Sequence, residues 1–466
     1  MGWGASLSIE VELMKETIHL LHVNDLHSHF EHWERIVRYM DEQKKLYEHA
    51  GDVVYKLDIG DHVDRFHPFT EGTMGKGNVE LLNAAGMDGA TIGNNEGITL
   101  PYEALDHLYD EARFPVTVAN LYDKNGKRPK WALPYFIRTT PHGRRIAFFG
   151  ITAPFTELYH LLGWKLTDPY EEIANVLEEL EGKADIIILL SHLGLPSDEW
   201  IAANYPNIHV ILGGHTHHIL HHGKMHGNTL LCGAGKYGMY VGHVEIMIDE
   251  CGISAVSSLE SMTDKGYTDQ EITVANELYD KGRAGLGEVL LELEHPLSAD
   301  WFRASEMPDI LCKALREWCK TDCAFLNAGL LLDGLNEGPV TRFDLHKICP
   351  HPINPCVLTV SGKELQRILV RTEDPKWPHF QLKGLGFRGS VMGMFVYDGL
   401  KKTNGKWLLH GEDIIQKAEY TLAVPDMFTF GYLFPEVRDV KRKRYLMPEF
   451  LRDLLGWKLA NLSFKE

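Results

Sequence analysis

The chain has 466 residues, of which 44% are hydrophobic and 24% charged, a composition typical of a soluble globular protein. This length exceeds what one hydrophobic core organises, so we expect two or three domains. The formal net charge of −18 argues against a surface that binds a nucleic-acid polymer, which needs clustered Lys and Arg. Small anionic substrates are not excluded, because a bound metal ion inverts the local potential.

The N-terminal stretch and the cysteines bear on the cellular compartment. Residues 1–16 contain Glu10, Glu12 and Glu16 and lack the apolar core of a signal peptide. No run of about 18 apolar residues occurs, which predicts no membrane span and no membrane partner. The seven cysteines form no C-x-x-C pair and are expected to be reduced, buried side chains. We therefore expect a cytoplasmic protein, and the sequence leaves its oligomeric state open.

The first half of the chain alternates β-branched apolar runs with helical patterns, which predicts an α/β domain. The expected strands cover residues 17–23, 53–59, 89–92, 114–119, 145–151, 185–190 and 207–212, and two closing antiparallel strands cover 229–232 and 240–248. The expected helices cover residues 32–48, 77–85 and 169–180.

Five of these strands end within one to three residues of a side chain that can bind a metal ion: Asp25, Asp61, Asn94, His192 and His215. The carboxyl ends of strands are where sites assemble in open α/β sheets, so we expect these five side chains to lie together. His27 and His217 each follow one of them at a spacing of two residues. The glycines before His215 allow a sharp turn and a close approach of the backbone.

Seven mixed oxygen and nitrogen ligands suit two metal ions better than one, with Asp61 as the expected bridge. Two ions roughly 3.5–4 Å apart clamp the attacking and leaving oxygens of a phosphoryl displacement and generate hydroxide at neutral pH. Carboxylate, amide and imidazole ligands without thiolates suit Mn, Zn, Fe, Co or Ni and do not distinguish among them.

The second half is expected to begin after a polar linker. Residues 264–285 are mostly polar and include a helical pattern at 271–283, so we divide the chain into residues 1–260, a linker at 261–286 and a second domain at 287–466. Expected strands of the second domain cover residues 289–294, 324–327, 356–360, 390–396 and 419–424, and expected helices cover 305–319 and 363–371.

The motifs of the first half, in chain order, resemble the signature of calcineurin-like metallophosphatases. They are Asp25-x-His27, Gly60-Asp61-x-x-Asp64-Arg65, Gly93-Asn94-x-Glu96, His192 and Gly214-His215-x-His217. With its second half, the whole chain resembles the 5'-nucleotidase/UDP-sugar hydrolase/2',3'-cyclic phosphodiesterase family. The resemblance implies an αββα sandwich followed by an α+β substrate domain. It also implies one ion held by Asp25, His27, Asp61 and His217, and another held by Asp61, Asn94, His192 and His215.

The second domain resembles the family's substrate domain less sharply, at residues 325–329, 338–341 and 359–365. There the family places a nucleoside between two aromatic rings. The resemblance implies these candidate substrate-binding residues: Asn327, His351, Asn354, Phe428 and Phe430. Either phenylalanine could instead belong to the core, and His351 and Asn354 could be plain turn residues beside prolines.

Two departures from the family pattern affect the expected chemistry. The family has a histidine where this chain has Asn95, which donates a hydrogen bond but delivers no proton. His62 is a candidate replacement, with a supporting or surface position as the alternative. The family's phosphate-binding arginine is replaced by Leu332. Arg65 could contact phosphate instead, or form a structural ion pair.

The expected function is a dimetal-dependent hydrolase of small phosphate esters, nucleotides first, in which a metal-bridging hydroxide attacks phosphorus in line. The alternative within enzymes is a phosphodiesterase for 2',3'-cyclic or other activated esters, because better leaving groups depend less on a protonating histidine. An alternative of another class is a non-catalytic sensor of nucleotide or metal. The complete set of ligands argues against such a decayed enzyme.

Overall fold

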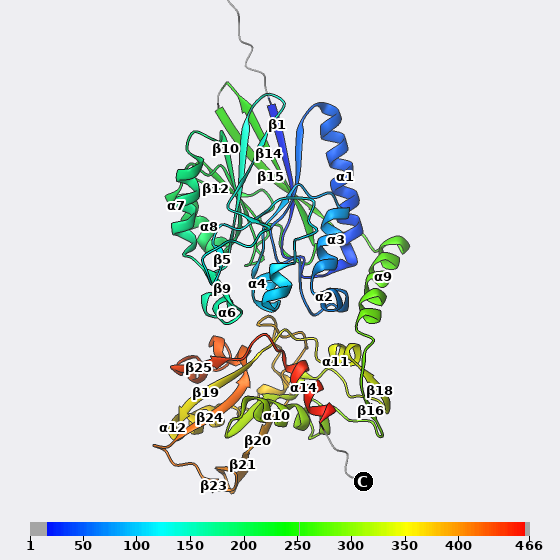
Figure 1. Ribbon diagram of the computed structural model, residues 1–466, viewed down its shortest axis with the longest axis vertical. Helices are drawn as coiled ribbons and strands as arrows, with labels where there is room; N and C mark the ends of the chain where they lie inside the picture. The colour runs from blue at the N-terminus through cyan, green and yellow to red at the C-terminus, as the bar shows by residue number, and fades with distance from the viewer. Residues whose placement is uncertain (1–15, 251, 462–466) are drawn as a thin grey trace, which may run out of the picture.

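The computed structural model describes residues 16–250 and 252–461. Figure 1 shows two domains stacked along the long axis and joined on one side by α9 (Asp269–Gly285). The prediction about a signal peptide falls on residues that, except for Glu16, lie outside the described part. Among the described helices, none combines the length and the apolar character that crossing a membrane requires.

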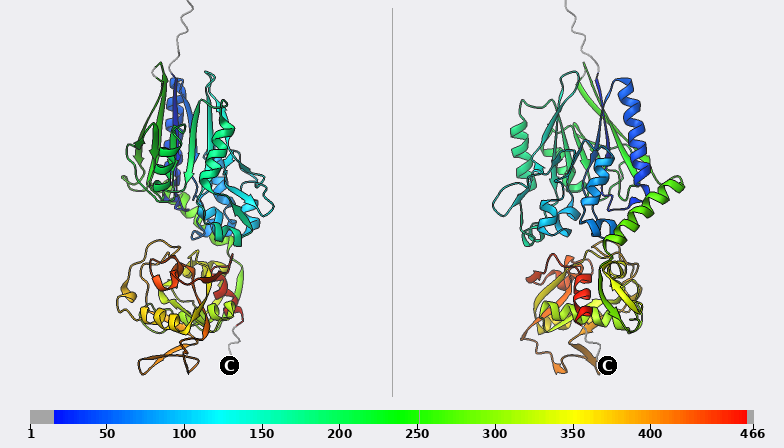
Figure 2. Two further views of the ribbon diagram at one scale, coloured as in Figure 1. Left: turned by 90° about the vertical axis from the view of Figure 1, so that its left-hand side faces the viewer. Right: turned by 45° about the vertical axis from the view of Figure 1, so that its right-hand side comes forward.

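The first domain contains two β-sheets that lie face to face (Figure 2). The order β15-β14-β1-β2-β3-β4-β6 describes one sheet, and the order β12-β13-β11-β10-β8-β7 describes the other. The strands of the first sheet are β1 (Glu16–Val23), β2 (Val53–Asp58), β3 (Gly89–Ala90), β4 (Val116–Thr117), β6 (Ala132–Leu133), β14 (Tyr240–Asp249) and β15 (Gly252–Ser261). The strands of the second sheet are β7 (Phe136–Thr139), β8 (Arg145–Thr152), β10 (Ile186–His192), β11 (Val210–Gly213), β12 (Lys224–His226) and β13 (Thr229–Cys232).

Alternating side chains of the strands explain the layers. Leu20 of β1 packs with Ile188 and Leu212 in the core between the sheets, whereas its neighbour Leu21 faces the helices outside, as the period of two in a strand requires. The helices α1 (Trp33–Ala50) and α3 (Lys76–Ala84) cover the first sheet. The helices α7 (Pro169–Leu180) and α8 (Leu195–Asn204) cover the second. The predicted αββα sandwich is confirmed.

The register of the central strands positions their carboxyl ends. The strands β1 and β2 are parallel, with Val23 opposite Asp58, and β10 and β11 are parallel, with Ser191 opposite Gly213. Parallel pairing brings the ends of each pair to one edge of the molecule. One detail differs from the prediction, because β13 pairs parallel with β11 and antiparallel only with β12. The long antiparallel partner of β14, β15, was not predicted.

The second domain is a mixed sheet with helices packed on it, as the predicted α+β class requires. Its strand order is β20-β17-β24-β19-β25. These strands are β17 (Cys323–Asn327), β19 (Pro355–Ser361), β20 (Phe395–Asp398), β24 (Glu419–Pro425) and β25 (Arg442–Tyr445), and the helices are α10 (Glu306–Cys319), α11 (Arg342–Ile348), α12 (Gly362–Arg371) and α14 (Leu451–Ala460). A separate pair, β16 (Val289–Leu293) and β18 (Gly338–Thr341), begins the domain.

One strand of the second domain is shorter than predicted. The sequence pattern at 390–396 predicts a strand, but β20 begins only at Phe395. The preceding loop bonds elsewhere, because the carbonyl groups of Met392 and Met394 accept hydrogen bonds from the amides of Gly329 and Ala328. The six described cysteines are buried and free, as predicted, and Cys251 lies outside the described residues.

The linker helix α9 is attached to the first domain by a buried ion pair. Glu271, in the capping box of α9, accepts hydrogen bonds from Arg35 of α1 at 2.6 Å and 2.9 Å. Hydrogen bonding to this guanidinium holds the pKa of Glu271 at about 2. The predicted linker helix is therefore present, and an ion pair joins its first turn to α1.

Candidate metal centre

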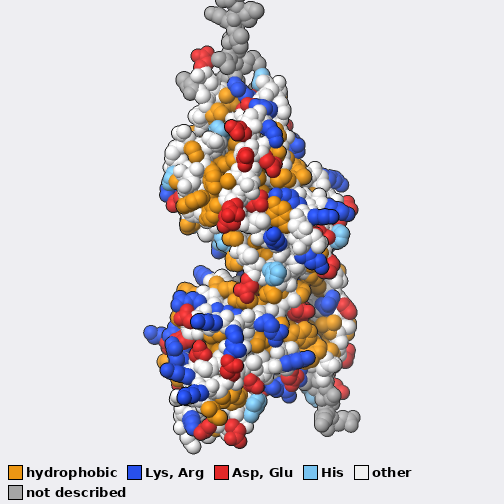
Figure 3. Space-filling model, turned by 60° about the vertical axis from the view of Figure 1, so that its left-hand side comes forward, with side chains coloured by type: hydrophobic (Ala, Val, Ile, Leu, Met, Phe, Trp, Pro, Cys, Tyr) orange, Lys and Arg blue, Asp and Glu red, His pale blue; other side chains and the backbone are white. Residues whose placement is uncertain are grey.

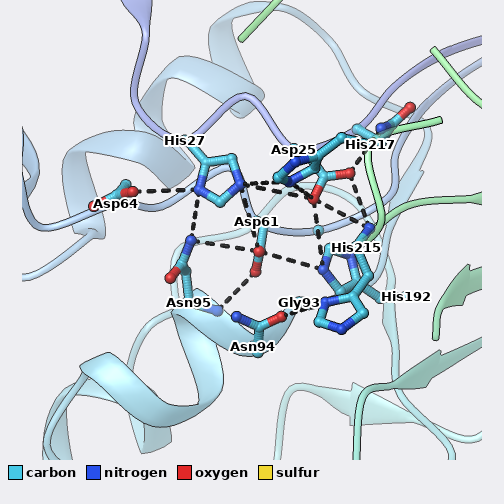
Figure 4. A network of polar contacts seen from close by, with 12 residues as sticks. Asp25, His27, Asp61, Asp64, Gly93, Asn94, Asn95, His192, His215 and His217 are labelled. Atoms are coloured by element: carbon cyan, nitrogen blue, oxygen red, sulfur yellow. Dashed lines mark hydrogen bonds and ion pairs between the residues drawn. The ribbon is translucent and has the colours of Figure 1, made fainter. Parts of the chain in front are cut away.

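The loops that follow β1, β2, β10 and β11, together with the start of α4 (Asn94–Thr99), form one cluster of polar side chains. Figure 4 shows all seven predicted ligands pointing toward a common centre. They are Asp25, His27, Asp61, Asn94, His192, His215 and His217. The cluster lies at the end of the first domain that faces the second (Figure 1).

The distances within the cluster fit ligands that share a metal ion. The Oδ1 atom of Asp25 lies 3.7 Å from His27 Nε2 and 3.3 Å from His217 Nε2. The Oδ2 atom of Asp61 lies 3.3 Å from His192 Nε2 and 3.7 Å from His27 Nε2. Bonds of about 2.0–2.2 Å to one ion place neighbouring ligand atoms roughly 3–4 Å apart. The groups Asp25–His27–His217 and Asp25–Asp61–His192 each meet this geometry.

Hydrogen bonds orient two of the imidazoles for metal binding. The Nδ1 atom of His192 lies 2.8 Å from the carbonyl oxygen of Ile59, so the proton on Nδ1 donates there and leaves the Nε2 lone pair free. That Nε2 atom is fully buried without a hydrogen-bond partner. The Nδ1 atom of His27 lies 3.3 Å from Asp64 Oδ2 and 2.6 Å from Asn95 Nδ2, which holds the ring with its Nε2 atom toward Asp25 and Asp61. Both imidazoles therefore direct Nε2 toward the carboxylates, where the deprotonated ring nitrogen would bind a divalent cation.

The backbone of the cluster is strained. Five of the seven ligands have positive φ angles, from 49° to 71°: Asp25, His27, Asp61, His215 and His217. Each such conformation costs a non-glycine residue of order 1–3 kcal/mol, and these strained residues concentrate at functional sites. The fold therefore holds these side chains in position at a cost in stability, which supports a functional role.

Gly93 and Glu96 keep the cluster compact. A Cβ atom at position 93 would lie 2.0 Å from Asp61 Oδ1 and 2.6 Å from His192 Cε1, so only glycine fits there. Glu96 is buried and accepts hydrogen bonds from the backbone amides of Asp61 at 3.0 Å, Gly93 at 2.8 Å and Val63 at 2.9 Å. Burial, followed by the charge of Asp61, raises the pKa of Glu96 to about 7. Glu96 thus pins the two loops that present Asp61 and Asn94.

The electrostatics are those of a site made for a cation. Burial alone would raise the pKa of Asp25, but the imidazoles of His192, His217 and His27 lower it overall. Burial alone would lower the pKa of His192, but the charges of Asp61 and Asp25 raise it to about 10. Without metal, protonated imidazoles therefore balance the buried carboxylates. A metal ion would displace those protons, since imidazole binds metal in its neutral form.

Two charged residues outside the predicted ligand set reach the cluster. Asp64, which is buried, accepts a hydrogen bond from Arg388 Nη2 of the second domain through the same Oδ2 atom that faces His27. Its Oδ1 atom accepts the backbone amide of Phe66 at 3.1 Å. Asp64 belongs to a motif of the sequence but was given no role. No sequence signal links it to Arg388, which lies 324 residues further along the chain.

The two predicted catalytic residues lie in different surroundings. Asn95 borders the cluster, with its backbone amide donating to Asp61 Oδ1 at 2.7 Å and its side-chain Nδ2 atom 2.6 Å from His27 Nδ1. His62 is buried against Trp33, with ring centroids 4.9 Å apart, and its Nδ1 atom lies 3.1 Å from Asn78 Nδ2. Burial lowers the pKa of His62 to about 3. This neutral, packed imidazole does not support the role of a replacement acid.

Arg65 does not lie with the ligands. Its guanidinium donates to Glu71 at 2.7 Å and 2.9 Å and to the carbonyl oxygen of Thr99 at 2.7 Å. Of the two alternatives drawn from the sequence, these contacts favour the structural ion pair over a phosphate contact.

The predicted residues of the substrate pocket are mostly buried. Phe428 stacks on Phe325 inside the core, with ring centroids 5.5 Å apart. The Nε2 atom of His351 donates to the carbonyl oxygen of Leu330, and its Nδ1 atom accepts the backbone amide of Arg388. The His351 ring stacks on Phe387. The side-chain amides of Asn327 and Asn354 donate to backbone carbonyl groups at 2.8 Å. Only Phe430 of this set is exposed, at 43%. These contacts do not form an aromatic sandwich for a base.

Comparison with known proteins agrees with this fold and this site. Residues 18–218 match the calcineurin-like phosphoesterase family, and residues 289–431 match the C-terminal domain family of 5'-nucleotidases. The chain is 47% identical over 461 residues to the uncharacterized metallophosphoesterase YunD of Bacillus subtilis, covering 96% of this chain and 100% of that protein. It is 22% identical to a snake venom 5'-nucleotidase of Gloydius brevicauda, covering 86% of this chain and 77% of that protein. The structure of the NAD nucleotidase NadN of Haemophilus influenzae has a similar fold, with a TM-score of 0.62 at 15% identity over 96% of each chain.

The fold and the His/Asp cluster define a metallophosphoesterase domain, and the cluster implies divalent metal ions. With both of its domains, the chain belongs to the 5'-nucleotidase family.

Proposed function

We propose that this protein is a dimetal-dependent hydrolase of phosphate esters that acts in the cytoplasm. Nucleotides are the substrates that we consider first. One observation carries the proposal: Asp25, His27, Asp61, His192 and His217 converge from strand ends with metal-ligand spacing. Asn94 and His215 lie beside them, 2.8 Å apart through Oδ1 and Nδ1. The buried, free cysteines support a reducing compartment. The family relationship supports phosphate esters of the nucleotide type as substrates.

Asp25, His27, Asp61 and His217 would hold one ion, and Asp61, Asn94, His192 and His215 the other. When bound, the two ions would activate water as a nucleophile and offset the charge that develops on the phosphoryl oxygens. The chain's own residues would keep the ligands oriented, through Ile59 and Asp64, and keep the two loops together through Glu96. The waist between the domains is notched in Figure 3, and a substrate would reach the cluster there.

The position of His62 favours a second candidate, hydrolysis of 2',3'-cyclic nucleotides or other activated diesters. Asn95 cannot deliver a proton, and His62 is packed against Trp33 and Phe30, with its Nδ1 atom 3.1 Å from Asn78 Nδ2. An ester whose leaving group needs no protonation would tolerate this arrangement. The well-kept ligand set argues against a sensor that has lost its catalytic function.

The test is a metal-dependent assay of the purified full chain loaded with Mn or Zn. The substrate panel contains nucleoside monophosphates, 2',3'-cyclic nucleotides, UDP-sugars and a generic diester. The variant Asp61→Asn, which removes the charge of one ligand, is the control. We expect turnover that requires metal and falls at least about 100-fold in Asp61→Asn. Faster turnover of cyclic substrates than of monophosphates would favour the second candidate. No turnover on any substrate with two ions bound would refute both.

A further inference from the structure

A series of hydrogen bonds runs from the core of the second domain toward the metal centre. It begins at His351, which is fully buried and stacks on Phe387, with ring centroids 5.1 Å apart. One ring nitrogen of His351 donates to the carbonyl oxygen of Leu330 at 2.9 Å, and the other accepts the backbone amide of Arg388 at 2.9 Å. The backbone at Arg388 is therefore fixed to the interior of the second domain.

The side chain of Arg388 reaches into the first domain. Its Nη2 atom donates to Asp64 Oδ2, and its guanidinium carbon lies 5.8 Å from the centre of the Phe66 ring. The same Oδ2 atom of Asp64 lies 3.3 Å from His27 Nδ1. Asp64 is buried, and among the described residues only Arg388 and His27 form ion pairs with it. One carboxylate thus joins a candidate metal ligand to the second domain.

Two other hydrogen bonds between the domains end on neighbouring residues of the first domain. His346 Nε2 donates to the carbonyl oxygen of Arg65 at 2.9 Å, and Arg452 Nη2 donates to Glu71 at 2.8 Å. Within the described part of the chain, no hydrogen bond or ion pair joins Arg65 or Glu71 to a candidate metal ligand. The contact made by Arg388 differs from both, because its acceptor also faces His27.

The position of Asp64 bears on how His27 would bind an ion. An imidazole that binds a metal through Nε2 keeps its proton on Nδ1. Asp64 Oδ2 and Asn95 Nδ2 both face that atom, at 3.3 Å and 2.6 Å, and the carboxylate is the stronger acceptor of the two groups. Losing such an acceptor typically lowers metal affinity about 10–100-fold. A buried carboxylate without its guanidinium partner is costly, so without Arg388 we expect Asp64 to turn away toward water.

From these contacts we propose that Arg388 is a positioning residue of the metal centre, and that it acts on His27 through Asp64. The inference rests on the proposed dimetal function. It makes the ion position formed by Asp25, His27 and His217 depend on contact between the two domains. Because coupling between binding equilibria is reciprocal, an ion at this position in turn favours the arrangement in which Arg388 contacts Asp64.

The test is a calorimetric titration of the metal-stripped full chain with Mn. Electron paramagnetic resonance distinguishes one bound Mn ion from a coupled pair. In the wild type we expect two binding steps, and in Arg388→Gln we expect one step to be about 10-fold weaker while the other is unchanged. The weakened step should be the one that His217→Ala removes. Arg388→Lys keeps the charge and a single donor group, so it should recover part of the loss.

The matched control is His346→Leu, which removes a different hydrogen bond between the domains and leaves Asp64 untouched. It should bind both ions as the wild type does. Thermal unfolding without metal shows whether each variant is folded, and if Arg388→Gln is not, Arg388→Lys decides. An equal loss in His346→Leu, or unchanged affinity in Arg388→Gln while the wild type binds two ions, overturns the inference. A wild type that binds no metal refutes the proposed function, and the inference with it.

Discussion

The substitution Gly93→Ala tests whether the compactness of the cluster is what allows it to bind metal. The new Cβ atom would lie 2.0 Å from Asp61 Oδ1 and 2.6 Å from His192 Cε1, whereas real Cβ atoms approach no closer than 3.0 Å. The carboxylate or the backbone must therefore move by about 1 Å. Metal sites tolerate deviations of about 0.2 Å in ligand distance, so Asp61 loses its place although no ligand has been removed. We expect metal affinity to fall about 100-fold or more.

The assay is titration of the metal-stripped protein with Mn, with bound metal counted by mass spectrometry after gel filtration. Thermal unfolding without metal shows whether the variant is folded. Gly266→Ala is the matched control, because its Cβ atom would meet no atom within 4 Å. Two ions bound to Gly93→Ala with wild-type affinity would show that the close approach of Gly93 to Asp61 and His192 is unimportant, and would refute the reasoning.

Three further predictions concern residues around the site and in the core. Asp64→Asn weakens the hold on His27, so calorimetry should show metal affinity about 10–100-fold lower, and an unchanged affinity would exclude an orienting role for Asp64. Glu71→Gln leaves the buried guanidiniums of Arg65 and Arg452 without their shared carboxylate, and urea unfolding should show a loss of about 3–5 kcal/mol; a loss below about 1 kcal/mol would contradict this. Burial, followed by the charge of His243, lowers the pKa of His22 to about 3 from 6.5. As the pH falls, the His22 imidazole is protonated in the unfolded chain before it is protonated in the folded protein. The free energy of unfolding therefore has its full value above pH 6.5 and falls by about 3 kcal/mol toward pH 4. The variant His22→Leu should have a flatter pH profile of stability, and an equally steep one would refute the assignment.

The positions of the metal ligands were predictable from sequence for a local reason. A short apolar run specifies a buried strand, and a glycine or polar residue directly after it specifies where the strand stops. Each of the loops after β1, β2, β10 and β11 can therefore be predicted from its local sequence. Parallel pairing of the strands then brings Asp25, Asp61, His192 and His215 to one edge. For the same reason, most of the predicted strands and helices lie within a few residues of observed ones, although β20 begins later than predicted and β15, α8, α11 and α14 were not predicted.

Side-chain surroundings were not predictable, because they depend on partners distant in the chain. Nothing near Asp64 indicates that Arg388 will reach it from the other domain. The aromatic character of Phe428 does not show whether it faces a ligand or Phe325, and the structure places it in the core. Likewise His62 follows a metal ligand directly, yet the backbone turn at Asp61 directs its ring to Trp33 instead of to the cluster.

The most direct test of the account is an anomalous-scattering crystal structure of the Mn-loaded full chain. We predict two peaks roughly 3.5–4 Å apart, one among Asp25, His27 and His217 and one beside His192, with Asp61 between them. A single peak, or peaks away from these side chains, would contradict the dimetal centre on which the proposed function depends.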